Sequence, residues 1–485
     1  MAFRRGLLAL SGFVFILFFA SFKITKSGLN TDGYNHLALT FDYTATTPLL
    51  NPPFVSGVIE DPTDPAANLG IVVDVKENNK DLSSSDYDLT VSSDNPLIVH
   101  NDKLSVTKSN GQATIKIIPS GFGYSNITLT LKKGKETTTL VINYAASNLS
   151  EFPNNTFWHT GISDASTAIA LDDDYMIVAD DEINQLYVYH RNQSGLPVSV
   201  FNYANMVGLT EGEHGNYKEI DCEAGTRSLK HPERFYWTGS MGNGGKSFKE
   251  KPNRSCLFAT DITGTGASTK FSYAGAYNNL KRQLIKWGNN QKYKFSAAAE
   301  SGQTPKRVGG FNIEGIAFAP DSTTLYIGFR APIVPVTNRT KALIAPIENF
   351  EAWFNNGHPK GEPVIGQPIE LSLGGRGIRD IAHLSDGTYV IVAGNSDEIL
   401  NGALYTWSGN PTDAPVLANI MEVYALKAEG YMEVTDKGKP TGKVQIISDN
   451  GSSSFYNDGL EAKFLNTNLR KFRSDIVNLH EAHNQ

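Results

Sequence analysis

The chain has 485 residues, of which 40% are hydrophobic and 19% are charged, and its 43 basic and 50 acidic residues give a formal net charge of -7. This composition is typical of a globular protein and excludes disordered, collagen-like and coiled-coil chains. Because the chain is acidic and has no basic cluster, we expect no nucleic acid partner.

The N-terminus has the pattern of an export signal. Arg4 and Arg5 precede an uncharged run at 6–22, which predicts a secretory signal peptide over 1–28. The alternative is a retained anchor, but a run of 17 residues is at the lower limit for crossing a bilayer. No cysteine follows the run closely, which excludes a lipoprotein. We therefore expect a secreted or periplasmic bacterial protein, with no membrane span after signal removal and with cell-envelope components as candidate partners.

The next segment, 36–146, has the alternating pattern of β-strands. Stretches such as 113–118 and 137–144 alternate apolar and polar residues and are separated by short polar turns. This spacing predicts a β-sandwich, and the segment resembles Ig-like or cadherin-like modules of bacterial surface proteins. A linker is expected at 147–156.

The remainder, 157–485, contains a repeat. The stretch 312–332 aligns without gaps with 377–397, and each copy reads as strand, polar turn, strand. Repeated units of several strands predict a β-propeller, so the whole protein is expected to be all-β. Five blades can be recognised, and the length would allow six or seven. Looser copies lie at 166–182, 221–243 and 428–451.

Two insertions interrupt the repeat, at 277–295 and 345–363, and both have some helical character. Long excursions on a propeller can cover one of its faces and form lids. Trp287 and Trp353 lie in these insertions, and we expect them to be available for stacking on a sugar ring.

The two cysteines, Cys222 and Cys256, would be oxidisable outside the cytoplasm. Cys222 lies in the predicted first strand of its blade and Cys256 in the third, about 9.5 Å apart. A disulfide needs Cα atoms within about 7 Å. We therefore expect two buried thiols.

Three sequence blocks resemble a known family. They are IEGIA followed by LYIGFRAP, GRGIRDIA followed by AGN, and FYWTGSMGN with a downstream NRSCLF. Together they resemble the bacterial domain-of-unknown-function 3616 family over most of 157–460, which implies a β-propeller-like fold and no established activity. A looser similarity links the general strand layout to bacterial propellers grouped as esterase-like phytases.

The repeat predicts a site at one mouth of the propeller channel. Hairpin pairing places Glu314 beside Phe329 and Arg330, and it places Arg379 beside Asn395. First strands of propeller blades line the central channel, so equivalent positions should meet there. The predicted ligand-binding residues are Glu223, Glu314, Arg330, Arg379, Asn395 and Glu429.

Three interpretations of this polar ring remain open. The residues could close the ring by ion pairs, for example Glu314 with Arg330. Glu223, Glu314 and Glu429 could instead hold Ca²⁺, the one cofactor that the pattern suggests. Alternatively, the ring could bind a carbohydrate, another polyol or an anionic, phosphate-bearing small molecule.

The functional prediction is therefore an exported propeller that binds a ligand at its channel mouth. A rival is a Ca²⁺-assisted hydrolase of phosphate or carboxyl esters, for which the sequence identifies no catalytic residue. A third possibility is a scaffold or adhesion protein without a small ligand.

Overall fold

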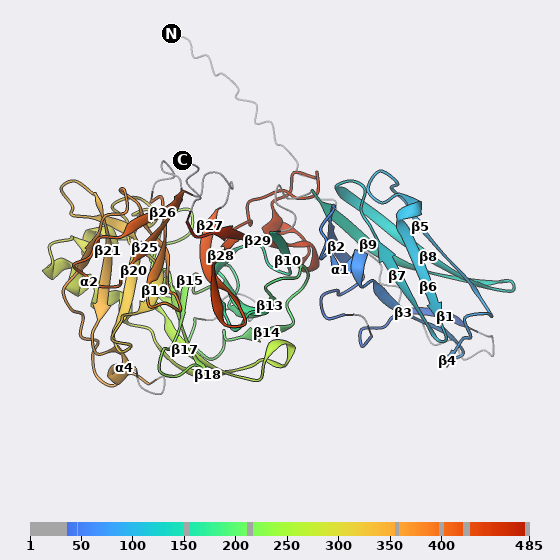
Figure 1. The fold of residues 1–485 in the computed structure, drawn as a ribbon, viewed down its shortest axis with the longest axis horizontal. Coiled ribbons are helices and arrows are strands. Elements are labelled where there is room, and N and C mark those ends of the chain that lie inside the picture. The colour runs from blue at the N-terminus through green and yellow to red at the C-terminus, as the bar shows by residue number, and fades with distance from the viewer. Residues whose placement is uncertain are drawn as a thin grey trace, which may run out of the picture. The chain divides into compact units, whose positions relative to one another are not determined.

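The computed structural model describes residues 36–45, 47–148, 155–210, 217–354, 358–396, 402–420 and 427–480. The predicted signal peptide and most of the predicted linker lie outside these residues. The described chain is mostly β, as predicted, and its strands form seven separate sheets (Figure 1). Within this part of the chain, no helix combines the length and apolar character that crossing a membrane requires.

Two sheets lie between residues 37 and 147 and share one hydrophobic core. Alternate side chains of a strand point to opposite faces of its sheet, so Val73 and Ile115 of one sheet meet Leu129 and Ile142 of the other. The first sheet has the order β1-β3-β7-β6, with β4 on β3, and the second has the order β2-β9-β8-β5. Their bounds are β1 Leu37–Phe41, β2 Phe54–Val58, β3 Ile71–Glu77, β4 Lys80–Asp81, β5 Asp88–Ser93, β6 Leu104–Ser109, β7 Gln112–Ile117, β8 Gly123–Lys133 and β9 Glu136–Ser147, with the short helix α1 at Pro65–Asn68.

The other five sheets have four strands each. Every chain segment that the sequence predicted as a repeat copy overlaps the first two strands of one of these sheets. Their bounds are β11 Ala165–Ala170, β12 Tyr175–Asp180, β13 Gln185–His190 and β14 Ser199–Asn202; β15 Cys222–Arg227, β16 Arg234–Gly239, β17 Leu257–Thr263 and β18 Lys270–Tyr277; β19 Asn312–Phe318, β20 Leu325–Val334, β21 Lys341–Ile347 and β22 Ile369–Leu371; β23 Gly377–His383, β24 Tyr389–Gly394, β25 Ala403–Trp407 and β26 Val416–Ile420; and β27 Ala428–Asp436, β28 Lys439–Ser448, β29 Lys471–Asn478 and β10 Thr156–Thr160.

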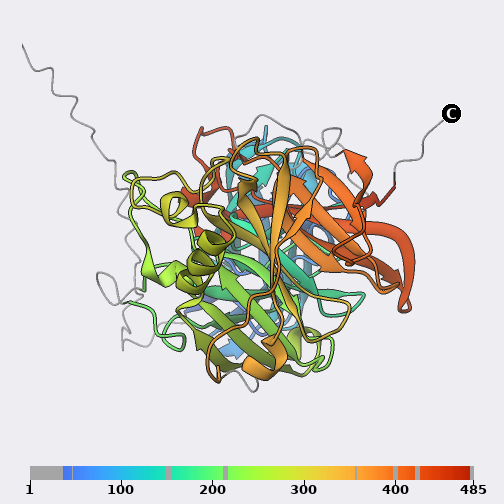
Figure 2. The same ribbon diagram turned by 90° about the vertical axis from the view of Figure 1, so that its left-hand side faces the viewer.

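These five sheets form a propeller-like ring. Their first strands contact one another in a cycle, from β11 through β15, β19, β23 and β27 back to β11. Figure 2 shows the sheets following one another in chain order from green through yellow and orange to red. The described chain therefore has five sheets in this ring, as many as the repeat copies recognised in the sequence.

The fifth sheet joins the two ends of the ring segment. Strand β10 pairs antiparallel with β29, with Thr156 opposite Asp475, and it is the outermost strand of a sheet whose other three strands come from the C-terminal part of the chain. The first strand after the predicted linker thus belongs to the last sheet (Figure 1).

Each inner strand carries a β-bulge at the same place. On the first strand of every sheet, one residue is left out of the pairing with the second strand, and such an extra residue re-aims its side chain. In the first four sheets it lies four residues before the end of the inner strand. The five bulge residues are Ser166, Glu223, Glu314, Arg379 and Glu429.

The backbones of two neighbouring sheets approach closely near the bulge at Arg379, and this explains the glycine at position 377. A Cβ atom at Gly377 would lie 2.0 Å from the carbonyl oxygen of Arg330 in the neighbouring sheet. We expect Gly377→Ala to lower the free energy of unfolding by about 1–3 kcal/mol, because the two strands must separate. Urea unfolding checks this. Gly309→Ala is the control, since its Cβ would approach only the flexible end of Arg339, and an equal loss there would contradict the explanation.

The two cysteines are free and buried, as predicted. Cys222 begins β15, the first strand of its sheet, and Cys256 directly precedes β17, the third strand. The intervening strand β16 separates them, which explains the absence of a disulfide.

The two insertion tryptophans pack into the core instead of facing a ligand. The insertions contain α2 (Leu280–Asn290), α3 (Phe295–Ala298) and α4 (Phe350–Trp353), confirming their helical character. Trp287 and Trp353 are 7% and 1% exposed and belong to one hydrophobic cluster with Phe295 and Phe350. Each indole N–H donates to a backbone carbonyl, that of Gly366 or Gly361. The prediction that these tryptophans stack on a sugar is therefore wrong.

Candidate functional site

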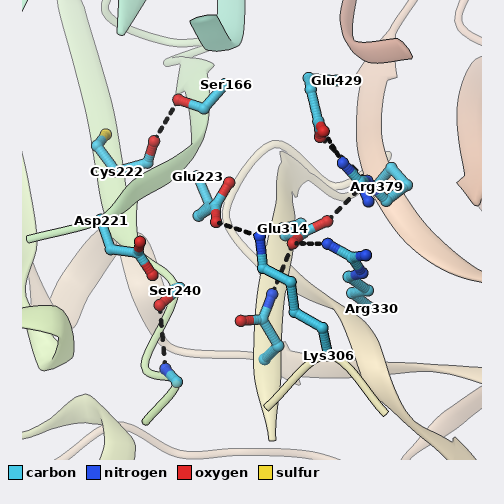
Figure 3. A network of polar contacts seen from close by, with 12 residues as sticks. Ser166, Asp221, Cys222, Glu223, Ser240, Lys306, Glu314, Arg330, Arg379 and Glu429 are labelled. Atoms are coloured by element: carbon cyan, nitrogen blue, oxygen red, sulfur yellow. Dashed lines mark hydrogen bonds and ion pairs between the residues drawn. The ribbon is translucent and has the colours of Figure 1, made fainter. Parts of the chain in front are cut away.

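Three of the five bulge residues form one buried network (Figure 3). Arg330 donates to Glu314 Oε1 at 2.9 Å, and Arg379 Nε lies 2.9 Å from Glu314 Oε2. Arg379 Nε also donates to Glu429 Oε2 at 3.0 Å. The network therefore connects the third, fourth and fifth sheets, and it contains the Glu314–Arg330 pair expected from the sequence.

The other two bulge residues complete the ring differently. Ser166 donates to the carbonyl oxygens of Ala179 and Cys222, which ties the first sheet to the second. In the described chain the cation paired with Glu223 is Lys306, whose Nζ lies 3.9 Å from Oε1, beyond hydrogen-bond reach. Sequence analysis missed Ser166 and Lys306, because Ser166 is uncharged in a loose repeat copy and Lys306 lies outside the repeat. The shared position four residues before the end of the inner strand would have identified Ser166.

The network is balanced in charge. Burial alone would raise the pKa of Glu314, but Arg330 and Arg379 outweigh burial and hold that pKa below its usual value. Glu314 and Glu429 thus have arginine partners, whereas the ion pair of Glu223 in the described part of the chain is with Lys306. This arrangement favours ion pairing over a cation held jointly by the three glutamates.

One predicted neighbour relation is wrong. Arg379 does not lie beside Asn395, because the pairs on either side of Arg379 are Ile378 with Ala393 and Asp380 with Val392. The turn of this hairpin is centred on Asp386, one residue before the centre expected from the sequence. The bulge at Arg379 then shifts the pairing of β23 with β24 further. Asn395 directly follows β24 and is half-buried.

The strand pairing predicted around Glu314 in the third sheet is correct. The pairs next to Glu314 are Ile313 with Phe329 and Gly315 with Gly328, so Glu314 lies beside Phe329 as predicted. The bulge at Glu314 shifts the register by one residue only, and Arg330 stays within reach of its carboxylate.

An acidic cluster lies at the same end of the inner strands. Asp181, Asp221 and Glu223 each offer a carboxylate oxygen, and these oxygens lie within 4.8 Å of one another. Burial, together with the charge of Glu314, raises the pKa of Glu223 to about 8. Burial and the charge of Glu223 also raise the pKa of Asp181 well above its usual value.

The opposite end of the inner strands borders a cavity of about 800 Å³. Its lining includes the last residues of four inner strands, namely Ala170, Arg227, Phe318 and His383. Four residues of strand, about 13 Å, separate these residues from the bulges. The cavity is therefore a second location, which sequence analysis did not predict. The acidic turn at 171–174, in the first repeat copy, was the signal that could have identified it.

Acidic groups dominate the cavity. Arg191 is held by Gln445 and by the carbonyl oxygens of Asp172 and Glu433, so its donors are largely used. Arg227 donates to two backbone carbonyls. The ionisable groups of the lining are Tyr431, the acids Asp172, Asp173, Asp174, Asp380 and Glu433, the two arginines, and His383, whose pKa is lowered by burial.

The sequence pattern of a family described as "Protein of unknown function (DUF3616)" matches residues 297–427. The match contains two of the three blocks on which the resemblance rests, and the block at 235–243 lies outside it. Among curated proteins, no match was found.

Several solved structures from Bacteroides are similar to the chain over most of its length. A protein of unknown function from Bacteroides thetaiotaomicron VPI-5482 is 8% identical, covering 88% of this chain and 84% of its own, with a TM-score of 0.28. A quinonprotein alcohol dehydrogenase-like protein from the same organism is 11% identical, with coverages of 89% and 99% and a TM-score of 0.28. A DUF4623 family protein from Bacteroides eggerthii DSM 20697 is 10% identical, with coverages of 87% and 76% and a TM-score of 0.27. Similarity at these TM-scores does not establish the fold. The fold is established by the strand pairing described above.

Proposed function

We propose that this is a secreted or periplasmic bacterial protein that binds a small polyhydroxylated ligand, such as a carbohydrate, at the mouth of its propeller. In this proposal residues 36–146 form an Ig-like module, 147–156 form a linker, and 157–485 form a five-bladed β-propeller. Two sheets on one core support the module, and the cycle of inner strands supports the propeller.

The observation that carries this proposal is the cavity at the ends of the inner strands. Its volume of about 800 Å³ lies within the range of small-molecule sites. Carboxylates accept hydrogen bonds from sugar hydroxyls. Besides the buried Asp380, the lining has four acids, Asp172, Asp173, Asp174 and Glu433, against two arginines whose donors are largely used. This balance favours a neutral polyol over a phosphate-bearing or other anionic ligand. Leu171, Leu229 and Phe318 add apolar surface for the ring faces of a sugar.

Binding of neutral and phosphorylated sugars by calorimetry tests the proposal. Asp174→Asn changes an exposed carboxylate of the lining, and we expect it to weaken binding of the neutral sugar about tenfold or more, since hydrogen bonds to charged groups contribute about 1.5–3 kcal/mol. Asp88→Asn, in β5 and also exposed, is the matched control and should bind normally.

Other outcomes decide between the remaining functions. Preference for phosphorylated sugars would contradict the polyol assignment. Turnover of phosphate or carboxyl esters would support the metal-assisted hydrolase. Absence of both sugar binding and ester turnover would favour a scaffold or adhesion protein.

A further inference from the structure

The acidic cluster described above joins two neighbouring sheets. Asp181 directly follows β12 of the first sheet, Asp221 directly precedes β15 of the second, and Glu223 is the bulge residue of β15. Ca²⁺ binds carboxylate oxygens at about 2.3–2.6 Å, so one ion can bridge oxygens about 4.6–5.2 Å apart. The observed separation of at most 4.8 Å therefore suits one shared ion.

Glu223 supplies a second, independent indication. Its side chain is 3% exposed, and Oε1 has no hydrogen-bond partner among the described residues. Oδ1 of Asp181 is likewise buried without a hydrogen bond in the described chain. A buried carboxylate without a partner is costly, and native proteins rarely leave one in that state.

Nearby cations compensate this cluster only in part. Arg254 lies 2.7 Å from Asp221 Oδ2, but it also pairs with Glu219 at 3.1 Å. Lys306 is 3.9 Å from Glu223, and its side chain is half exposed. The arginines that neutralise the other bulge glutamates belong to the third and fourth sheets, and neither forms an ion pair with Glu223 in the described structure.

We propose that Asp181, Asp221 and Glu223 bind a divalent cation, Ca²⁺, between the first and second sheets. The ligands are oxygens only, which suits a hard ion, and Ca²⁺ accepts irregular cages completed by water or backbone oxygens more readily than Mg²⁺ does. The ion takes the place that arginine holds in the third to fifth sheets. This site lies at the other end of the inner strands from the cavity, so the inference does not depend on the proposed function.

Calcium titration of chelator-treated protein tests the site. We expect saturable heat of binding and a rise of several degrees in the thermal midpoint with Ca²⁺, because a ligand that binds the folded state stabilises it. Mg²⁺ should act more weakly. An unchanged midpoint and no heat of binding at millimolar Ca²⁺ would overturn the proposal.

Two matched variants identify the ligands. Glu223→Gln should weaken Ca²⁺ binding more than tenfold and abolish the thermal response. Without metal it should be at least as stable as the chelated parent, because the glutamine amide has the same size and carries no charge beside Asp181 and Asp221. A loss of Ca²⁺ binding in this variant would therefore not come from a failure to fold. Glu182→Gln changes the exposed acid of a second group, formed with Asp164 and Asp181, and should respond like the parent. Loss of binding in Glu182→Gln with retention in Glu223→Gln would overturn the assignment.

Discussion

Replacement of Arg379 by methionine is expected to lower the free energy of unfolding by about 3–5 kcal/mol. Arg379 lies between the carboxylates of Glu314 and Glu429, and its side chain is 14% exposed. Removal of the guanidinium leaves both carboxylates buried without this partner, although Arg330 still pairs with Glu314. Chemical denaturation of the parent and the variant measures the loss.

The control separates the ion pairs from general packing. Adding Glu429→Gln to Arg379→Met should recover part of the loss, because the second change removes one of the stranded charges. Arg282→Met, at an exposed position of α2, should change stability by less than about 0.5 kcal/mol. Strict additivity of the Arg379 and Glu429 variants would contradict the network.

The second large effect is a pH dependence that comes from Asp380. This carboxyl group is 3% exposed, and burial raises its pKa to about 7, although the backbone N–H groups of Tyr431 and Ile381 lower it in part. The folded protein therefore holds this proton up to about pH 7, whereas the unfolded chain releases it near pH 4. The stability that the protonated group contributes is complete below pH 4 and is lost as the pH rises through 7.

Comparison with Asp380→Asn isolates this effect. The free energy of unfolding of the parent, relative to that of the variant, should fall by up to about 4 kcal/mol between pH 4 and 7. This figure follows because the pKa of Asp380 differs by roughly three units between the folded and unfolded states. Urea unfolding at several pH values measures this difference. Asp386→Asn is the contrast, because hydrogen bonds from Thr388 lower the pKa of Asp386, and its contribution is lost as the pH falls. If the difference in free energy of unfolding between the parent and Asp380→Asn does not vary with pH, the raised pKa of Asp380 does not control stability.

Local patterns predicted most of the ring. The five hairpins were recognisable because apolar residues alternate along each inner strand and a polar turn follows. Strand β10 was not, since its partner β29 is more than 300 residues away and long-range pairing leaves no local signal. Trp287 and Trp353 were misjudged because position in an insertion does not reveal whether a side chain packs inward.

The candidate site was predicted in part. Glu314, Arg379 and Glu429 occupy equivalent bulges and meet, as the repeat predicted. Counting along strands could not detect the bulge at Arg379. This bulge, together with a turn centred one residue earlier than expected, is why Arg379 was placed beside Asn395.

The placement of β10 has a consequence for synthesis on the ribosome. A nascent chain can form the first four sheets of the ring as they emerge, but β10 must wait for β29, which is made more than 300 residues later. Until then the edge of β10 is unpaired and open to pairing with another chain. We infer that a premature stop before residue 471 leaves β10 without its partner strand and with an exposed edge, and that such truncated chains are prone to aggregate.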